Sequence, residues 1–234
     1  YSQTSTVRYA SATLHFGEEP MLVGQGGSGT VFFTHCNLRC VFCQNYQISW
    51  EGLGQNVSPD HLAHVFLHLQ QRGAENINLV TATHCIQPVL LALEQAYRQG
   101  LTLPVVYNTN GYETVALLEC LEGIVDIYLP DLKYMLPDAA ARYSGAADYP
   151  ETAKRALIEM YRQVGPYRTS QDEQTKGVIL RHLVLPDNIA GTYDLLLWLR
   201  DEKLLDIPLS LMCQYSPQYR ANEYPELRRT VTAE

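Results

Sequence analysis

The chain alternates short apolar runs with longer segments in which apolar residues recur every three or four positions. Side chains repeat every two residues in a strand and every 3.6 residues in a helix, so the short runs predict strands and the longer segments predict helices. We predict strands at residues 30–34, 76–82, 103–107, 124–129, 178–185 and 207–212. We predict one helix between Ser58 and Gly73, and others at 88–98, 112–121, 151–164 and 193–200.

This regular alternation predicts an α/β fold, because a strand that is followed by a helix and a further strand forms a parallel sheet with the helices outside. Six such units predict a partial (βα)6 barrel, since a full eightfold barrel typically needs ~250 residues. No linker divides the chain. We therefore expect one domain at residues 24–234, with an N-terminal arm at 1–23 packed on it. In such folds the chemistry gathers at the carboxyl ends of the strands.

Composition excludes several classes of protein. The 234 residues are 46% hydrophobic and 18% charged, which is typical of a soluble globular chain. The formal net charge of −8 argues against a protein that coats nucleic acid or an anionic membrane. The longest apolar run, at 195–199, is far too short to span a bilayer, and the first residues show no signal pattern. We expect a cytoplasmic protein without a membrane partner.

Three of the six cysteines are bunched directly after the first predicted strand, at Cys36, Cys40 and Cys43. Cysteines spaced C-x3-C-x2-C can hold three corners of a [4Fe–4S] cluster and leave the fourth iron open for a substrate or cofactor. A structural zinc site that uses the three cysteines with His35 or His84 is the alternative. The chain is not cysteine-dense enough for a small disulfide scaffold.

The three-cysteine motif, with Phe42 just before its last cysteine, resembles the signature of the radical S-adenosylmethionine (radical SAM) superfamily. The wider segment HCNLRCVFCQNYQIS, which follows Gly26-Gly27-Ser28-Gly29, resembles the pyruvate formate-lyase-activating enzyme and its relatives. Three later motifs resemble those of the same enzymes in the same order: NTNG at 108–111, DLK at 131–133 and RHLVLP at 181–186. The resemblance extends over roughly residues 24–217.

The resemblance implies a partial barrel that holds a [4Fe–4S] cluster, whose open iron binds S-adenosyl-L-methionine. It implies reductive cleavage to a 5′-deoxyadenosyl radical that activates a glycyl-radical protein partner, with electrons from a flavodoxin- or ferredoxin-type donor. Two alternatives stay open. The same chemistry can act on a small molecule or another peptide, or the chain can be a zinc-stabilised binding module without catalysis.

The resemblance also implies residues on the cofactor side, with two departures from the family pattern. Thr81, Thr83 and His84 stand where most of the superfamily has Gly-Gly-Glu, and their side chains can accept hydrogen bonds from the cofactor's ammonium group. His84 can equally be a packed or capping residue. Asn108 replaces an aspartate of the activating enzyme, which removes a charge and puts that enzyme's monovalent cation in doubt here.

Further expected cofactor contacts follow the later motifs. Asp131 and Lys133 come directly after a predicted strand and are two residues apart, so their side chains can point the same way. Lys133 suits the cofactor's carboxylate, and Asp131 can position Lys133 or bind a ribose hydroxyl. Arginine binds carboxylates in a bidentate manner, which favours Arg181. The remaining expected cofactor contacts are Phe42, Thr109 and Leu183.

Other conspicuous residues receive a structural interpretation. His61, His64 and His68 mimic a metal site at helical spacing, but we expect them on a solvated helix face. Cys120 lies among leucines, so we expect a small core residue. Cys85, beside His84, is the remaining cysteine of chemical interest. After the last strand, Gln214 or Tyr215 stands where the family places a histidine.

Overall fold

The computed structural model describes residues 6–168 and 175–231. By its contacts the chain divides into two compact units. The first unit comprises Tyr1–Cys36 and Gln47–Asn108, and the second comprises Asn37–Tyr46 and Thr109–Glu234. Within the described residues, no helix is long and apolar enough to cross a membrane.

The first unit is built on strands β1 (Val7–His15), β2 (Ser28–Phe33), β3 (Gln55–Val57), β4 (Ile77–Val80) and β5 (Val105–Thr109). Its helices are α1 (Pro20–Val23), α3 (Pro59–Gln71), α4 (Ile86–Arg98) and a 3-10 turn at Thr83–Cys85, and the short α2 (Tyr46–Ser49) starts in the second unit. The predicted cap of α3 is confirmed, because Ser58 Oγ accepts a hydrogen bond from His61 N at 3.2 Å.

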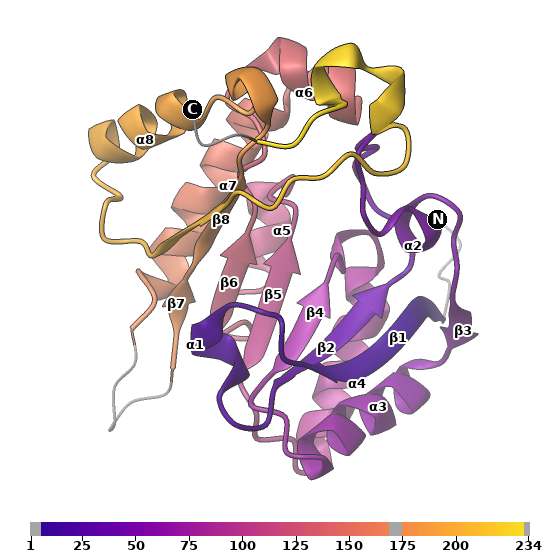
Figure 1. The fold of residues 1–234 in the computed structure, drawn as a ribbon. Coiled ribbons are helices and arrows are strands. Elements are labelled where there is room, and N and C mark those ends of the chain that lie inside the picture. The colour runs from indigo at the N-terminus through magenta and orange to yellow at the C-terminus, as the bar shows by residue number, and fades with distance from the viewer. Residues whose placement is uncertain (1–5, 169–174, 232–234) are drawn as a thin grey trace. The chain divides into compact units, whose positions relative to one another are not determined.

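Strands β2, β4 and β5 lie side by side and parallel, as predicted. Strand β1 pairs antiparallel with β2, and β3 pairs antiparallel with β1. Figure 1 shows these strands with α3 and α4 along one face. The sequence analysis did not predict β1, which forms within the expected N-terminal arm. Polar residues interrupt its apolar ones, a pattern that suits a strand near the sheet edge.

The two faces of this sheet differ in polarity. Gly29 lies against Leu69 of α3, so the odd-numbered positions of β2 face the helix. These positions and their neighbours carry buried apolar side chains, among them Val31, Ile77 and Val105. The opposite face, which we call the polar face, carries buried polar side chains at Ser28, Thr30, Asn76, Asn78 and Asn108. An apolar face is covered by helices, whereas a buried polar face requires internal hydrogen-bond partners.

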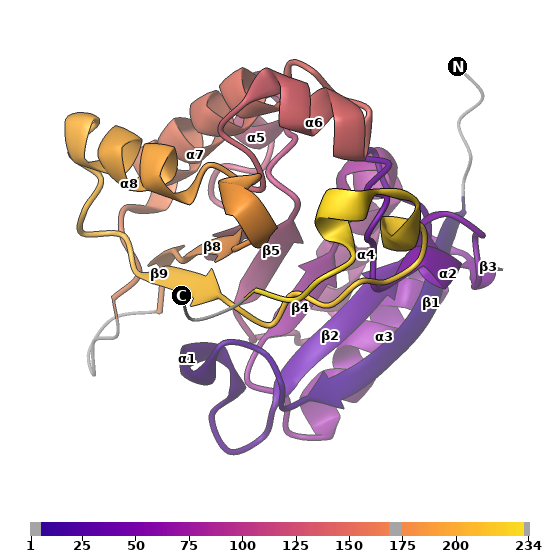
Figure 2. The ribbon, with the colours of Figure 1, turned by 45° about the horizontal axis from the view of Figure 1, so that its top comes forward.

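The second unit contains β6 (Ile127–Pro130), β7 (Gly177–Val178), β8 (Leu180–Leu183) and β9 (Leu209–Met212). Its helices are α5 (Val115–Glu119), α6 (Pro137–Ser144), α7 (Tyr149–Val164) and α8 (Thr192–Asp201), with 3-10 turns at Pro186–Asn188, Ala221–Glu223 and Pro225–Leu227. Strand β6 pairs in parallel with β7, and β8 pairs in parallel with β9. Helix α7 packs against α5, α6, β6 and β7. Figure 2 shows α7 beside α6, and β8 beside β9.

The predicted α/β class with mostly parallel strands is confirmed. Each predicted strand is present, although the one expected at 178–185 is divided into β7 and β8. The division occurs because Val178 pairs with β6 whereas Leu180 pairs with β9. The sequence analysis missed α6, which begins at Pro137, four positions after the end of the DLK segment at Lys133. The boundary between an arm at 1–23 and one domain at 24–234 stays a prediction.

Gly29 tests the close packing of β2 against its neighbours. A Cβ at this position would lie 2.5 Å from the backbone oxygen of Asn76 and 2.9 Å from the Cβ of Ala74. We expect Gly29→Ala to lower the free energy of unfolding by ~1–3 kcal/mol, measured by urea denaturation. Gly17→Ala is the control, because a Cβ there meets only the ring of His15. Equal stability of the two variants would contradict this packing.

Candidate active site

The segment that carries Cys36, Cys40 and Cys43, which we call the cysteine loop, begins at the carboxyl end of β2, as the sequence analysis expected. Thr34 follows the strand, and His35 has a left-handed backbone with φ of 75°. Cys36 ends the first segment of the first unit, and Asn37–Tyr46 belongs to the second unit. All six cysteines lie in the described part of the chain, and none forms a disulfide. Cys36, Cys40 and Cys43 are half-buried thiols.

Backbone hydrogen bonds fix the middle of this loop to the carboxyl end of α6. Arg39 N donates to Ser144 O at 3.1 Å, and Val41 N donates to Tyr143 O at 2.9 Å. The Ser144 hydroxyl also donates to Cys40 Sγ at 3.0 Å. The loop therefore has a defined seat on α6, and one of its sulfur atoms receives a hydrogen bond there.

Aromatic side chains surround the same loop on its apolar side. Phe42 is buried and makes edge contacts with Tyr134 and Tyr215, at ring-centroid distances of 6.5 and 5.8 Å. The Tyr215 hydroxyl donates to Leu227 O at 2.8 Å, and burial raises the pKa of Tyr215 to about 12. Tyr215 thus packs beneath the loop with its hydroxyl occupied. A cofactor contact of Gln214 or Tyr215 stays a prediction.

The donors of the loop fit an iron–sulfur cluster. Three half-buried thiols without disulfides lie within eight residues, and one of them already accepts a hydrogen bond, as cluster cysteines commonly do. Among the described residues, no three His, Cys, Asp or Glu side chains converge as a preformed metal site. The fit therefore depends on the chemistry and spacing of the donors.

Strain accumulates at the carboxyl end of β4. Thr81 has φ of 60°, which is an outlier for a β-branched residue, and its N–H donates to Asn108 O at 2.9 Å. Backbone strain of this kind costs about 1–3 kcal/mol and is concentrated at functional sites. Thr83 starts the 3-10 turn that follows. Both residues lie in the first unit, and their contacts with a cofactor stay predictions.

His84 has a structural role in the first unit. Its Nε2–H donates to the carbonyl of Thr34 at 2.7 Å, and its ring meets that of His35 at 6.3 Å. Partial burial lowers the pKa of His84, and the nearby His35 lowers it further against the opposing effect of the Thr34 carbonyl. His84 thereby holds the residue that opens the cysteine loop. With Nε2 protonated, its Nδ1 is the nitrogen that can accept a hydrogen bond.

Glu18 is a residue that the sequence analysis missed. Its Oε2 accepts hydrogen bonds from Asn78 Nδ2 at 3.0 Å and from Asn108 Nδ2 at 3.1 Å. Glu18, in the segment that follows β1, therefore places a carboxylate beside Asn108. Two carboxylates at these positions would repel each other, so an amide at position 108 suits Glu18. No local motif marks Glu18, because its partners are 60 and 90 residues away.

Asp131, Lys133 and Arg181 meet in the second unit, as the sequence analysis expected for the first two. Lys133 Nζ lies 2.6 Å from Asp131 Oδ2, and Arg181 Nε lies 2.9 Å from Asp131 Oδ1. Burial by itself raises the pKa of Asp131, but Arg181 and Lys133 outweigh it and hold the pKa of this carboxyl below its usual range. Burial lowers the pKa of Lys133, and Asp131 reverses this to a net increase. Together these three side chains carry one net positive charge.

The other expected contacts in the second unit are placed as follows. The Thr109 hydroxyl donates to Glu113 Oε1 at 2.5 Å and accepts from Gly111 N at 3.2 Å, so it is occupied within its own turn. Leu183 is half-buried at the end of β8, where it pairs with Met212. Their contacts with a cofactor stay predictions.

The structure also places the histidines and cysteines for which we expected no cofactor contact. His61, His64 and His68 are exposed on α3, as expected. Cys120 was expected in the core but is exposed, because α5 ends at Glu119 and turns this residue outward. Burial raises the pKa of Cys85 to about 12, which makes it a poor nucleophile.

Comparison with known proteins decides the family. The model of the radical SAM superfamily matches residues 30–170, which is more than half of the chain. The chain belongs to the radical SAM superfamily. Membership implies an enzyme that uses a [4Fe–4S] cluster and S-adenosylmethionine, and the residues of the loop described above fit that cluster.

One curated protein and two solved structures are similar to this chain. The radical SAM chain is 32% identical, over 97% of its length, to an uncharacterised protein of Methanocaldococcus jannaschii, of which it covers 64%. Its fold is similar to that of native anSMEcpe with bound AdoMet and Cp18Cys peptide, with a TM-score of 0.57, 10% identity and coverage of 84% of this chain and 52% of that one. Native anSMEcpe with bound AdoMet gives a TM-score of 0.51 at 9% identity, with coverage of 83% and 56%. The chain thus spans less than two thirds of the length of each of these three proteins.

Asn108 tests the pairing with Glu18. We expect Asn108→Asp to lower the free energy of unfolding by about 1–3 kcal/mol at pH 7, because a hydrogen-bond donor becomes a second carboxylate. The deficit should shrink as the pH falls to 4.5, since the added carboxyl has a raised pKa in the folded protein and binds a proton there. Urea denaturation between pH 4.5 and 8 measures this. A deficit that does not change with pH would contradict the pairing.

A substitution at Asp131 tests whether this carboxylate holds Lys133 and Arg181 together. We expect Asp131→Asn to lower the free energy of unfolding by about 2 kcal/mol, below the ~3–5 kcal/mol of a fully buried pair, because its side chain is 15% exposed. Glu223→Gln removes an exposed carboxylate from Arg220 and should leave stability near that of the wild type. If both variants lose the same stability, Asp131 does not hold the two cations.

Proposed function

We propose that this radical SAM protein is an activating enzyme that makes a glycyl radical on a partner protein. When bound, the cluster would be held by Cys36, Cys40 and Cys43 and would supply one-electron reductive cleavage of S-adenosylmethionine, with the electron drawn from a flavodoxin- or ferredoxin-type donor. The cleavage would give methionine and, with a hydrogen atom taken from a backbone glycine of the partner, 5′-deoxyadenosine and the glycyl radical. The protein places these groups and excludes water.

The observation that carries the proposal is the cysteine loop. Cys36, Cys40 and Cys43 follow the carboxyl end of β2, and the loop is seated on α6 by the hydrogen bonds of Arg39 and Val41. Cys40, which lies between these two residues, also accepts a hydrogen bond from the Ser144 hydroxyl. Three protein ligands leave one iron of the cluster open, and that iron is where S-adenosylmethionine is proposed to bind.

Polar side chains in each unit, taken separately, suit one group of the methionine part of this cofactor. Lys133 and Arg181 exceed Asp131 by one positive charge, which favours the cofactor's carboxylate. In the first unit, Thr81 and Thr83 carry hydroxyls and His84 keeps Nδ1 as an acceptor, so each suits the cofactor's ammonium group. We propose these roles for the residues of each unit separately.

Sequence motifs and one solved structure bear on the nature of the substrate. The NTNG, DLK and RHLVLP segments are similar to those of the pyruvate formate-lyase-activating enzyme, which favours a glycyl-radical partner. The fold similarity to a protein with a bound peptide agrees with a polypeptide substrate. The alternative is the same radical chemistry on another peptide or a small molecule.

Anaerobic reconstitution with iron and sulfide tests the proposed chemistry. With dithionite as the reductant, we expect 5′-deoxyadenosine to form from S-adenosylmethionine, and we expect at least a 100-fold loss of that rate in Cys36→Ala. Cys120→Ala is the matched control, because this cysteine is exposed and lies outside the loop, and it should keep the wild-type rate.

Two outcomes would contradict the proposal. If Cys36→Ala cleaves S-adenosylmethionine as fast as Cys120→Ala, the cysteine loop is not the site. If the wild type binds stoichiometric zinc and no iron, the chain is a zinc-stabilised module. Electron paramagnetic resonance on a co-encoded partner then separates the substrates, since a glycyl radical gives a doublet and a small-molecule substrate leaves no protein radical.

A further inference from the structure

A chain of two hydroxyl groups ends on one sulfur atom of the cysteine loop. The Ser144 hydroxyl donates to Cys40 Sγ at 3.0 Å, and the Tyr134 hydroxyl lies 2.8 Å from Ser144 Oγ. Ser144 and Tyr134 are 2% and 0% exposed. These groups come from three parts of the second unit: the cysteine loop, the segment after β6, and the last residue of α6.

The direction of the chain follows from the number of protons. A serine hydroxyl has one proton, and Ser144 gives it to Cys40. Tyr134 must therefore donate to Ser144. The Tyr134 O–H thus points to Ser144 and the Ser144 O–H to the sulfur, and each bond polarises the next because both residues are buried.

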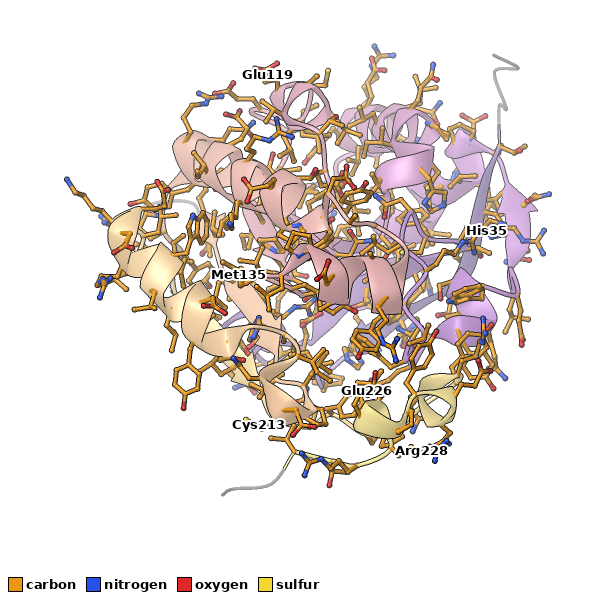
Figure 3. The ribbon with its side chains drawn as sticks, turned by 90° about the horizontal axis from the view of Figure 1, so that it is seen from above. His35, Glu119, Met135, Cys213, Glu226 and Arg228 are labelled. Atoms are coloured by element: carbon orange, nitrogen blue, oxygen red, sulfur yellow. The ribbon has the colours of Figure 1, made fainter. Side chains whose placement is uncertain are left out.

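The backbone keeps Ser144 in this position. The carbonyl of Ser144 accepts from Arg39 N at 3.1 Å, while its hydroxyl faces Cys40. One residue thus holds the loop by its backbone and contacts the sulfur by its side chain. The carboxyl end of α6 also gains an ion pair outside the loop, where Arg142 Nη2 lies 2.8 Å from Oε1 of Glu226, a residue labelled in Figure 3.

We propose that Ser144, supported by Tyr134, sets the reduction potential of the cluster bound at Cys40. This inference rests on the proposed function, because it requires the [4Fe–4S] cluster. A hydrogen bond to a ligand sulfur stabilises the extra negative charge of the reduced cluster, so it raises the reduction potential. Ser144 acts through Cys40 and is therefore a positioning residue. Its loss makes the cluster harder to reduce by the electron donor.

The test is a redox titration of the reconstituted full chain, followed by the electron paramagnetic resonance signal of the reduced cluster. We expect Ser144→Ala to shift the midpoint potential to a more negative value, and Tyr134→Phe to shift it in the same direction by less. Ser144→Thr keeps a hydroxyl and should restore a potential near that of the wild type.

Tyr143→Phe is the matched control. Tyr143 precedes Ser144 on α6 and is buried, but its hydroxyl donates to Glu226 at 2.5 Å. This variant loses a partly buried hydroxyl on the neighbouring residue without removing a donor to sulfur, so we expect the wild-type potential.

The outcomes separate this inference from the proposed function. Full iron and sulfide content in Ser144→Ala, with an unchanged potential, would overturn the inference and leave the proposed function intact. Equal shifts in Ser144→Ala and Tyr143→Phe would also overturn it, because packing and not the hydrogen bond would then be responsible. A wild-type chain that binds no iron would overturn both.

Discussion

The attachment of the cysteine loop to α6 is the interaction on which the proposed chemistry depends. Arg39 and Val41 use their backbone N–H groups to bind Ser144 and Tyr143 at the end of the helix. Backbone bonds hold this part of the loop regardless of the side chains on it, so Cys40, between Arg39 and Val41, stays beside Ser144. Phe42 then packs against Tyr134 and Tyr215 and completes the apolar side of the loop. A cluster bound here inherits this support.

Charge is distributed locally in a way that the net charge of −8 conceals. In the second unit, Asp131 holds Lys133 and Arg181 together and leaves one positive charge. In the first unit, Glu18 provides a carboxylate to the amides of Asn78 and Asn108 on the polar face. Each unit thus presents a different sign of charge among its candidate residues.

Local patterns in the sequence predict much of this arrangement. The helix cap at Ser58 and the strand that precedes Cys36 depend on neighbouring residues, and the structure confirms both predictions. Asp131 and Lys133 were paired because two residues in extended chain point the same way. Contacts between distant residues leave no such pattern. Ser144 and Cys40 are 104 positions apart, and Glu18 and Asn108 are 90 apart, so only the folded chain shows them. Strand β1 was missed because its apolar residues alternate imperfectly with polar ones.

Mössbauer spectroscopy of the chain reconstituted with ⁵⁷Fe, with and without S-adenosylmethionine, tests the central claim most directly. We expect four irons per chain and a change in the signal of one of them when S-adenosylmethionine binds, because three cysteines leave one iron open. Four irons that do not respond to S-adenosylmethionine, or a chain that holds no iron, would contradict the account.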